Sequence, residues 1–102
     1  MRSVVWANAA LADLRGQIAY IVKDDHDAAL RVADRLVQAG TNLGVALTGR
    51  PGRLENMYEK SVVGVPYIIA YAVDRGSREE ETVVILRIIH SSRDWKPGSW
   101  PA

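Results

Sequence analysis

The residues best suited to chemistry gather at the end of an apolar run, Thr82–His90, in which Arg87 is the one charged side chain apart from the terminal histidine. His90 closes the run, and Arg93 and Trp95 follow it within five residues. Histidine titrates near neutral pH and can act as a general acid or base, while arginine binds phosphate and carboxylate groups. The same pattern fits a catalytic site, a surface that binds another protein, or the ordinary end of a strand.

Each of these residues also has a structural explanation. A partly buried strand-end histidine with local hydrogen bonds is commoner than a catalytic one, and we favour that interpretation of His90. Arg87 is more informative, because a charge inside an apolar strand must reach solvent, pair with a carboxylate or serve a binding face. Trp95 and Trp100 either fold back over the edge of the sheet or anchor a protein interface, where tryptophan is enriched.

Signatures of the common catalytic and cofactor sites are missing from the sequence. It contains no GxxxxGK(S/T) or GxGxxG phosphate-binding loop, no HExxH zinc motif and no GxSxG nucleophile turn. His26 lies between Asp25 and Asp27 in a polar turn, and it has no metal-ligand spacing with His90. We therefore expect neither a metal nor a cofactor.

Composition predicts one soluble domain with little sign of nucleic-acid binding. The 102 residues carry 13 basic and 12 acidic side chains, whereas proteins that bind phosphates usually have a clear cationic excess. The absence of cysteine excludes disulfides and thiolate metal sites and fits a reducing compartment. No stretch approaches the roughly 20 apolar residues of a membrane span, and no signal peptide is evident, so we expect a cytoplasmic protein. Residues 1–96 are expected to form one domain, followed by a tail, residues 97–102.

Periodicity along the chain predicts an α+β domain in which a helical hairpin covers an antiparallel sheet. Asn8 is expected to cap the first helix, and the acidic turn before residue 28 suits the start of the second. The expected order is β-α-α-β-β-β: a strand over 3–6, helices over 9–23 and 28–46, a strand formed from 54–58 with 61–63, and strands over 67–73 and 82–90.

Two finer expectations concern packing. Gly40 and Gly44 lie one helical turn apart beside the apolar stripe, which indicates that another segment of backbone approaches the second helix closely. Alternation in strand 67–73 places Tyr67 and Tyr71 on one face. Strict alternation in the last strand places one further set of side chains on a face opposite Arg87: Val84, Leu86, Ile88 and His90.

Four segments together resemble a known family. They are "VVWANAALADLRGQIAYIVKDD" from Val4, "GRPGR" at 49–53, "VPYIIAYAVD" at 65–74 and "VVILRIIHSSRDW" at 83–95. In this order they resemble the RelE/ParE superfamily of bacterial type II toxins, and most of all its ParE-like plasmid-stabilisation branch. The resemblance covers residues 4–95 and implies a helical hairpin on a small antiparallel sheet, the same arrangement that the periodicity predicts.

The resemblance also implies a function and partners. It implies a toxin neutralised by a cognate, ParD-like antitoxin, whose disordered segment folds on binding. ParE-like members are associated with inhibition of DNA gyrase by protein–protein contact. RelE-like members cleave messenger RNA on the ribosome, which is the alternative, and a non-toxic member that only binds its antitoxin is a third. A homodimer or a toxin–antitoxin hetero-oligomer is expected.

The residues fit the nuclease alternative poorly. Where the glutamate-using RelE-like branch has its acid, Gly52 stands here, and its strand arginine falls near Tyr67. The set of candidates for a nuclease is His90, Arg87, Arg53 and Arg93. The set of candidates for partner binding is Arg53, Tyr67, Arg87, His90, Arg93 and Trp95. The near-neutral charge favours a protein-binding toxin, while the acidic segment Glu79–Glu81 and the tail Pro97–Ala102 depart from the family pattern.

Overall fold

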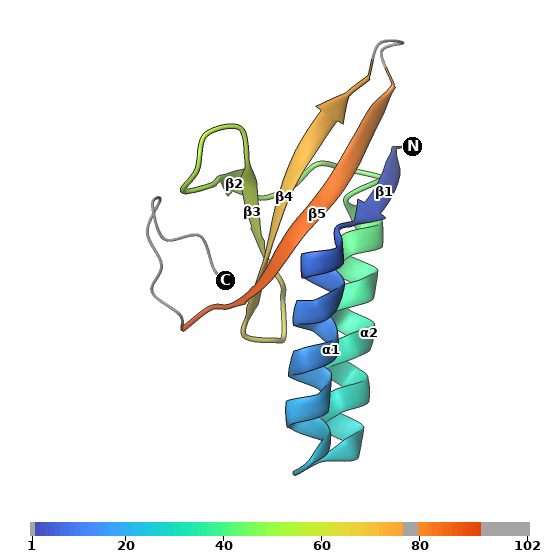
Figure 1. Ribbon diagram of the computed structural model, residues 1–102, viewed down its shortest axis with the longest axis vertical. Coiled ribbons are helices and arrows are strands. Elements are labelled where there is room, and N and C mark those ends of the chain that lie inside the picture. The colour runs from blue at the N-terminus through green and yellow to red at the C-terminus, as the bar shows by residue number, and fades with distance from the viewer. Residues whose placement is uncertain (1, 77–79, 93–102) are drawn as a thin grey trace.

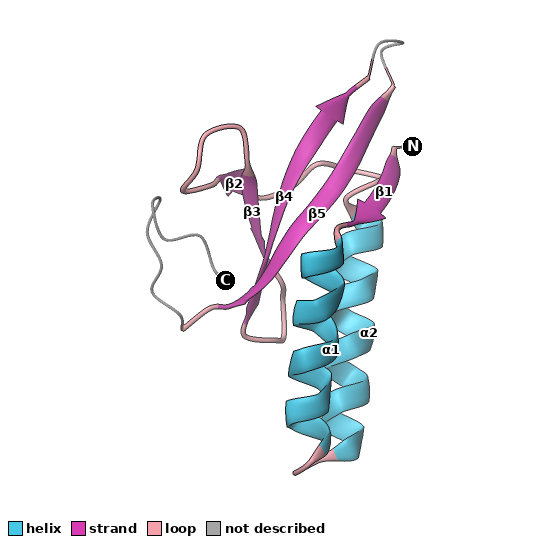
Figure 2. Cartoon of the chain, in the orientation of Figure 1, coloured by secondary structure: helices cyan, strands magenta, loops and turns pink. Residues whose placement is uncertain are grey.

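Five strands form one sheet, and a pair of antiparallel helices packs on one face of it (Figures 1 and 2). The computed structural model describes residues 2–76 and 80–92 of the chain. The predicted α+β class is confirmed, with one short strand more than expected. The elements are β1 (Ser3–Trp6), α1 (Asn8–Val22), α2 (His26–Asn42), β2 (Arg50–Pro51), β3 (Tyr58–Ser61), β4 (Tyr67–Arg75) and β5 (Glu81–His90).

The sheet has the strand order β1-β5-β4-β3-β2, so the last strand of the chain lies inside it. β1 pairs with β5 in parallel, from Ser3 opposite Thr82 to Trp6 opposite Ile85. The other neighbours are antiparallel. β5 is apolar on both faces because each face contributes to a core, with Val83, Ile85 and Ile88 in one and Ile89 in the other.

The N-terminal ends of the two helices differ in how they are capped. Asp25 accepts a hydrogen bond from the Ala28 N–H at 3.0 Å, which confirms the acidic cap of α2. The expected cap at Asn8 is wrong, because Ala7 is the capping residue and Asn8 already lies in α1. The Ala7 N–H donates instead to the Ile85 carbonyl of β5, so sheet pairing continues up to the first helical residue.

A β-bulge in β5 changes the face on which its side chains lie. Ala70 is opposite Arg87 and Tyr71 is opposite Ile85, which leaves Leu86 as the extra residue. Val83, Ile85 and, beyond the bulge, Ile88 therefore belong to the core under the helices. The predicted common face for Val84, Leu86, Ile88 and His90 is wrong, since an inserted residue reverses the alternation.

Apolar side chains are buried on both faces of the sheet. The larger core lies under the helices and includes Tyr67 and Tyr71, so the predicted face of β4 is confirmed. A smaller core on the other face unites Met57, Ala70 and Ile89. Neither α1 nor α2 combines the length with the hydrophobicity that a membrane-spanning helix needs.

The loop between β2 and β3 replaces a predicted strand. Residues 54–57 form a turn in which Asn56 has a φ of 63°, and β3 starts only at Tyr58. Leu54 and Met57 pack on the smaller core rather than in a strand. Gly49, just before β2, has a φ of 108° and lies close to β3. A Cβ added at Gly49 would lie 2.5 Å from the carbonyl oxygen of Glu59 in β3.

The expected close approach is confirmed, by the backbone of Arg2 just before β1 at Gly44 and by the side chains of Trp6 and Ile85 at Gly40. A Cβ at Gly40 would lie 2.6 Å from Cζ2 of Trp6 and 2.8 Å from Cδ1 of Ile85. The Arg2 N–H also donates to the Gly44 carbonyl at 2.8 Å. Glycine at these positions lets the end of α2 lie directly on β1.

Gly40→Ala is therefore expected to lower the free energy of unfolding by about 1–2 kcal/mol, since overpacking outweighs the helix propensity of alanine. Gly16 is the matched control, because it lies within α1 and an added Cβ would meet nothing within 4 Å. Gly16→Ala should raise the free energy of unfolding by about 0.5–1 kcal/mol. Urea denaturation measures both, and two changes of the same sign would contradict the packing account.

Candidate functional site

His90 lies at the end of β5 and uses one ring nitrogen for a local contact. Its Nδ1 accepts a hydrogen bond from the Ser92 N–H at 3.2 Å and lies 2.6 Å from the Ser92 hydroxyl. Tyr67, directly opposite on β4, meets the imidazole edge-on with ring centroids 5.3 Å apart. The half-buried ring is thus held by its neighbours, and Nε2 is the nitrogen that remains for other chemistry.

Tyr67 is buried rather than displayed on the surface. Its hydroxyl donates to Oε1 of Gln17 on α1 at 3.0 Å. Burial raises the pKa of Tyr67 above its ordinary value of 10.0, so the hydroxyl stays protonated at neutral pH. The side chain connects β4 to the helical layer and offers little surface to a partner.

Arg87 is paired with Asp13 of α1, which the sequence did not single out. Nε of Arg87 lies 2.7 Å from Oδ2 and one terminal nitrogen lies 2.9 Å from Oδ1, so the pair is bidentate. The two side chains are 11% and 17% exposed. Hydrogen bonding to Asp13 raises the pKa of Arg87 further, against the effect of burial. Of the three expectations for a charge in an apolar strand, pairing is the one that holds.

The Asp13 carboxylate also accepts a hydrogen bond from the edge of the sheet. β1 ends opposite Ile85, so among the described residues no strand lies beside the following part of β5 on that side. Oδ2 of Asp13 accepts a hydrogen bond from the Ile88 N–H at 3.0 Å. The helix thereby supplies an acceptor to a strand amide that would otherwise lack one.

Arg53 belongs to a second charged cluster around Glu59, which is 2% exposed. The Arg53 N–H donates to Oε2 of Glu59 at 3.0 Å, and the Arg53 Nε lies 3.6 Å from the same oxygen. Arg50 lies 3.5 Å from Oε1. The sequence offered a signal for Glu59, because it alternates with buried Met57 and follows two arginines.

Of the candidate nuclease residues within the described chain, Arg87 and His90 line one cleft, whereas Arg53 lies apart from them. Glu59, the partner of Arg53, is opposite Ala70, whereas His90 is opposite Tyr67, three residues further along β4. Glu59 and His90 are therefore two strand spacings apart across the sheet and three residues apart along it, which places their backbones roughly 14 Å from each other. The predicted Arg93 and Trp95 lie outside the described residues.

A polar cleft lies beside His90. It has a volume of about 240 Å³ and is bordered by α1 and the end of β5, with Gln17, Arg87 and His90 among its lining residues. In the described part of the chain, no three histidine, cysteine, aspartate or glutamate side chains come together to hold a metal ion.

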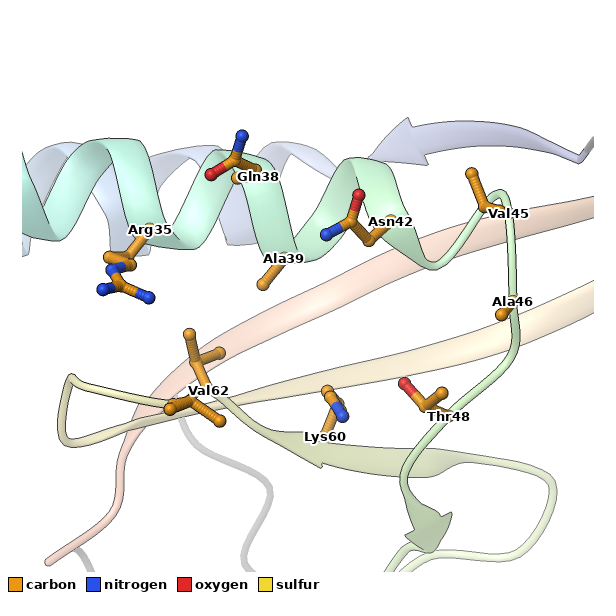
Figure 3. Close-up of a pocket in the computed structure, with 10 residues that line it drawn as sticks. Arg35, Gln38, Ala39, Asn42, Val45, Ala46, Thr48, Lys60 and Val62 are labelled. Carbon is orange, nitrogen blue, oxygen red and sulfur yellow. The ribbon is translucent and has the colours of Figure 1, made fainter.

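A larger groove of about 430 Å³ separates α2 from β3 (Figure 3). Arg35 and Ala39 extend from α2 towards β3, and Val62 faces them (Figure 3). The residues lining the groove were not predicted, since they come from three segments: Arg35, Gln38, Ala39, Asn42, Val45, Ala46, Thr48, Lys60, Val62 and Val63.

Comparisons of the sequence and of the fold lead to toxin–antitoxin systems. Residues 4–95 match the family described as "ParE toxin of type II toxin-antitoxin system, parDE". A protein of Sinorhizobium fredii named "Putative toxin Y4kP" is 37% identical over 95 residues, which cover 92% of this chain and 93% of that protein. The fold is shared with a structure titled "Chromosomal ParDE TA system from P. aeruginosa", with a TM-score of 0.77 and 23% identity over 88% of this chain and 96% of that chain.

Asp13→Ala should lower the free energy of unfolding by about 2–4 kcal/mol, because it leaves a largely buried guanidinium and the Ile88 amide without their acceptor. Removal of the exposed carboxylate of Asp34 on α2 is the control, and Asp34→Ala should change stability by less than about 0.5 kcal/mol. Chemical denaturation measures both. Equal effects of the two substitutions would show that the ion pair does not hold the helix on the sheet.

Alkaline pH should destabilise the protein through Tyr67 and Tyr71, whose pKa values burial raises. Their contribution to stability is fully present below the unfolded-state pKa of about 10 and is lost as pH rises through the folded-state pKa. Replacing both with phenylalanine should flatten the loss of stability above pH ~10. The exposed Tyr20 provides the control, since Tyr20→Phe should leave the wild-type pH dependence of denaturation unchanged. Parallel curves for the double variant and wild type would contradict this.

Proposed function

This chain belongs to the ParE toxin family of type II toxin–antitoxin systems, and we propose that it inhibits DNA gyrase by protein–protein contact. The pairing of Arg87 with Asp13 is the observation that carries this proposal. Cleavage of RNA needs a proton-transfer group together with cations directed at the phosphate. Arg87, three residues before His90, already has its charge neutralised by a carboxylate, which favours a toxin that binds over one that cleaves.

Electrostatics supports the same choice. The net charge is +1. The guanidinium of Arg53, in the loop before β3, forms an ion pair with the carboxylate of Glu59. A nuclease that held messenger RNA on the ribosome would need a strong cationic excess for its phosphate contacts. A protein target places no such demand on the whole surface.

The cleft beside His90 favours a second candidate, a RelE-like mRNA interferase. Nε2 of His90 is open to a proton-transfer role, and Gln17 borders the same space. In this alternative His90 and Arg87 carry the chemistry, with Arg53 and Arg93 as further candidates. The described contacts offer His90 no carboxylate partner, which is why we rank this function second.

We further propose that the protein is cytoplasmic and forms a hetero-oligomer with its antitoxin, which keeps the toxin inactive until the antitoxin is lost. Such a pair, carried on a plasmid, would stabilise that plasmid. A free homodimer is the alternative assembly. The family membership supports an antitoxin partner in general.

His90→Ala separates the two functions, tested in a gyrase supercoiling assay beside a ribosome-dependent messenger cleavage assay. A gyrase inhibitor should keep its inhibition within about threefold, whereas a histidine-dependent nuclease should lose roughly 100- to 10,000-fold. His26→Ala, in an exposed turn, is the matched control. Circular dichroism verifies that each variant is folded.

The wild-type protein decides between the targets. Inhibition of supercoiling with intact messenger supports gyrase, while cleavage at ribosomal A-sites with unaffected gyrase overturns that proposal in favour of the interferase. If the protein neither inhibits supercoiling nor causes messenger cleavage, both mechanisms are overturned, and the protein is a family member that only binds its antitoxin.

A further inference from the structure

A separate pocket lies at the end of the sheet that the helices leave uncovered. β4 and β5 extend past the helical pair at the end where β4 finishes and β5 begins (Figure 1). The pocket there has a volume of about 370 Å³, which is within the range of sites that hold a small ligand. We call it the Tyr58 pocket, and its lining residues, none of which it shares with the groove between α2 and β3, are Leu47, Asn56, Tyr58, Val73 and Arg75.

The ring of Tyr58 forms the aromatic wall of the pocket, and the fold fixes its position. Tyr58 lies opposite Tyr71 in the sheet, and the two rings stack with centroids 5.5 Å apart and planes 25° apart. Tyr71 is buried, and its hydroxyl donates a hydrogen bond to the Thr48 carbonyl. Tyr58 is 38% exposed, so a further ring can pack against an aromatic side chain that is already held in place.

Neighbouring segments hold the other walls of the Tyr58 pocket. The hydrogen bond from Tyr71 to Thr48 also places Leu47, one residue earlier, beside the pocket. Glu59 is buried on the opposite face of β3, opposite Ala70, and this alternation directs Tyr58 to the face of the pocket. A pocket formed before binding loses little conformational freedom when a partner enters it.

The rim of the pocket carries a cation, the 78% exposed side chain of Arg75. Its Nε lies 3.2 Å from one oxygen of Glu81, and Nε of Arg2 lies 2.8 Å from the other oxygen of the same carboxylate. One carboxylate thus faces two guanidinium groups, which leaves an excess of positive charge beside the aromatic wall. An aromatic ring with a carboxylate close to it matches both features.

We propose that the Tyr58 pocket receives an aromatic side chain of the toxin's protein target, next to an acidic residue whose carboxylate pairs with Arg75. The inference rests on the proposed inhibition of gyrase by protein–protein contact, and it adds which part of the toxin meets the target and which side chains it selects. Aromatic side chains that fill a pocket commonly dominate the affinity of an interface. A nucleic-acid strand is a poorer fit, because it is bound by a series of cations along its phosphates.

Phenylacetate, an aromatic ring with a carboxylate, probes the pocket without the target. In a nitrogen-15 NMR titration of the toxin, it should bind with a Kd of roughly 1–10 mM and shift the amide signals of the five residues that line the pocket. Cyclohexylacetate keeps the carboxylate but has no aromatic ring, so it should bind about 2- to 10-fold more weakly. Equal binding of the two compounds, or shifts confined to other segments, overturns the proposal.

Binding of toxin variants to purified gyrase tests the aromatic wall and the cation in turn. Tyr58→Ala should weaken binding about 10- to 100-fold, whereas Tyr58→Phe keeps the ring and should stay within about twofold of wild type. Arg75→Gln, at an exposed position that leaves the core intact, should weaken binding about 3- to 10-fold, most clearly at low salt. Tyr20→Ala and Arg15→Gln remove exposed side chains of the same types from α1, and both should match wild type.

The two experiments distinguish failure of the pocket from failure of the proposed target. If gyrase binds wild type, Tyr58→Ala and Arg75→Gln equally well, the pocket proposal fails alone. If gyrase does not bind wild type, the proposed target fails, while binding of phenylacetate at the pocket still supports its selectivity for an aromatic acid and absence of binding overturns it. Loss of antitoxin binding by Tyr58→Ala, with gyrase binding unchanged, also overturns the proposal.

Discussion

The contact on which the rest of the fold depends is that of the Asp13 carboxylate with Arg87 and the Ile88 amide. β1 ends opposite Ile85, and beyond that point the described part of the chain gives β5 a strand neighbour on one side alone, β4. A helix normally cannot replace a strand, because its own amides and carbonyls are used internally. One carboxylate overcomes this limit, since it accepts from the strand amide and neutralises the charge beside it. The helical layer is thereby attached to the sheet where strand pairing stops.

The bulge and the glycines complete that attachment. Leu86, the extra residue in β5, lies next to Arg87 and reverses the alternation, so Ile88 returns to the core under the helices. Near the end of α2, Gly40 lets this helix lie against Trp6 of β1. The first strand is therefore held between the end of α2 and β5. These contacts are short-range packing effects, and a single added methyl group is enough to disturb them.

The polar residues of this domain divide into two kinds by the partners they have. At the end of β5, His90 is held by Ser92 and Tyr67, and Arg87 by Asp13, so most of their bonding capacity serves the fold. Along the groove between α2 and β3, the charges of Arg35 and Lys60 have no counterpart in the described chain. Satisfied polar groups stabilise a structure, whereas cations beside exposed apolar surface are available to a partner.

The sequence by itself determined the α+β class, the order of the elements, the acidic cap of α2, the buried face of β4 and the family, because periodicity, cap chemistry and residue size act over a few neighbouring positions. It also indicated that Arg87 needs a partner. Only the tertiary structure decided which partner, since Asp13 lies 74 positions away. The bulge at Leu86, the burial of Glu59 and the groove likewise depend on strand register and on segments that meet only after folding. Local patterns therefore predict elements, while their mutual contacts decide which charges are used by the fold and which remain for a partner.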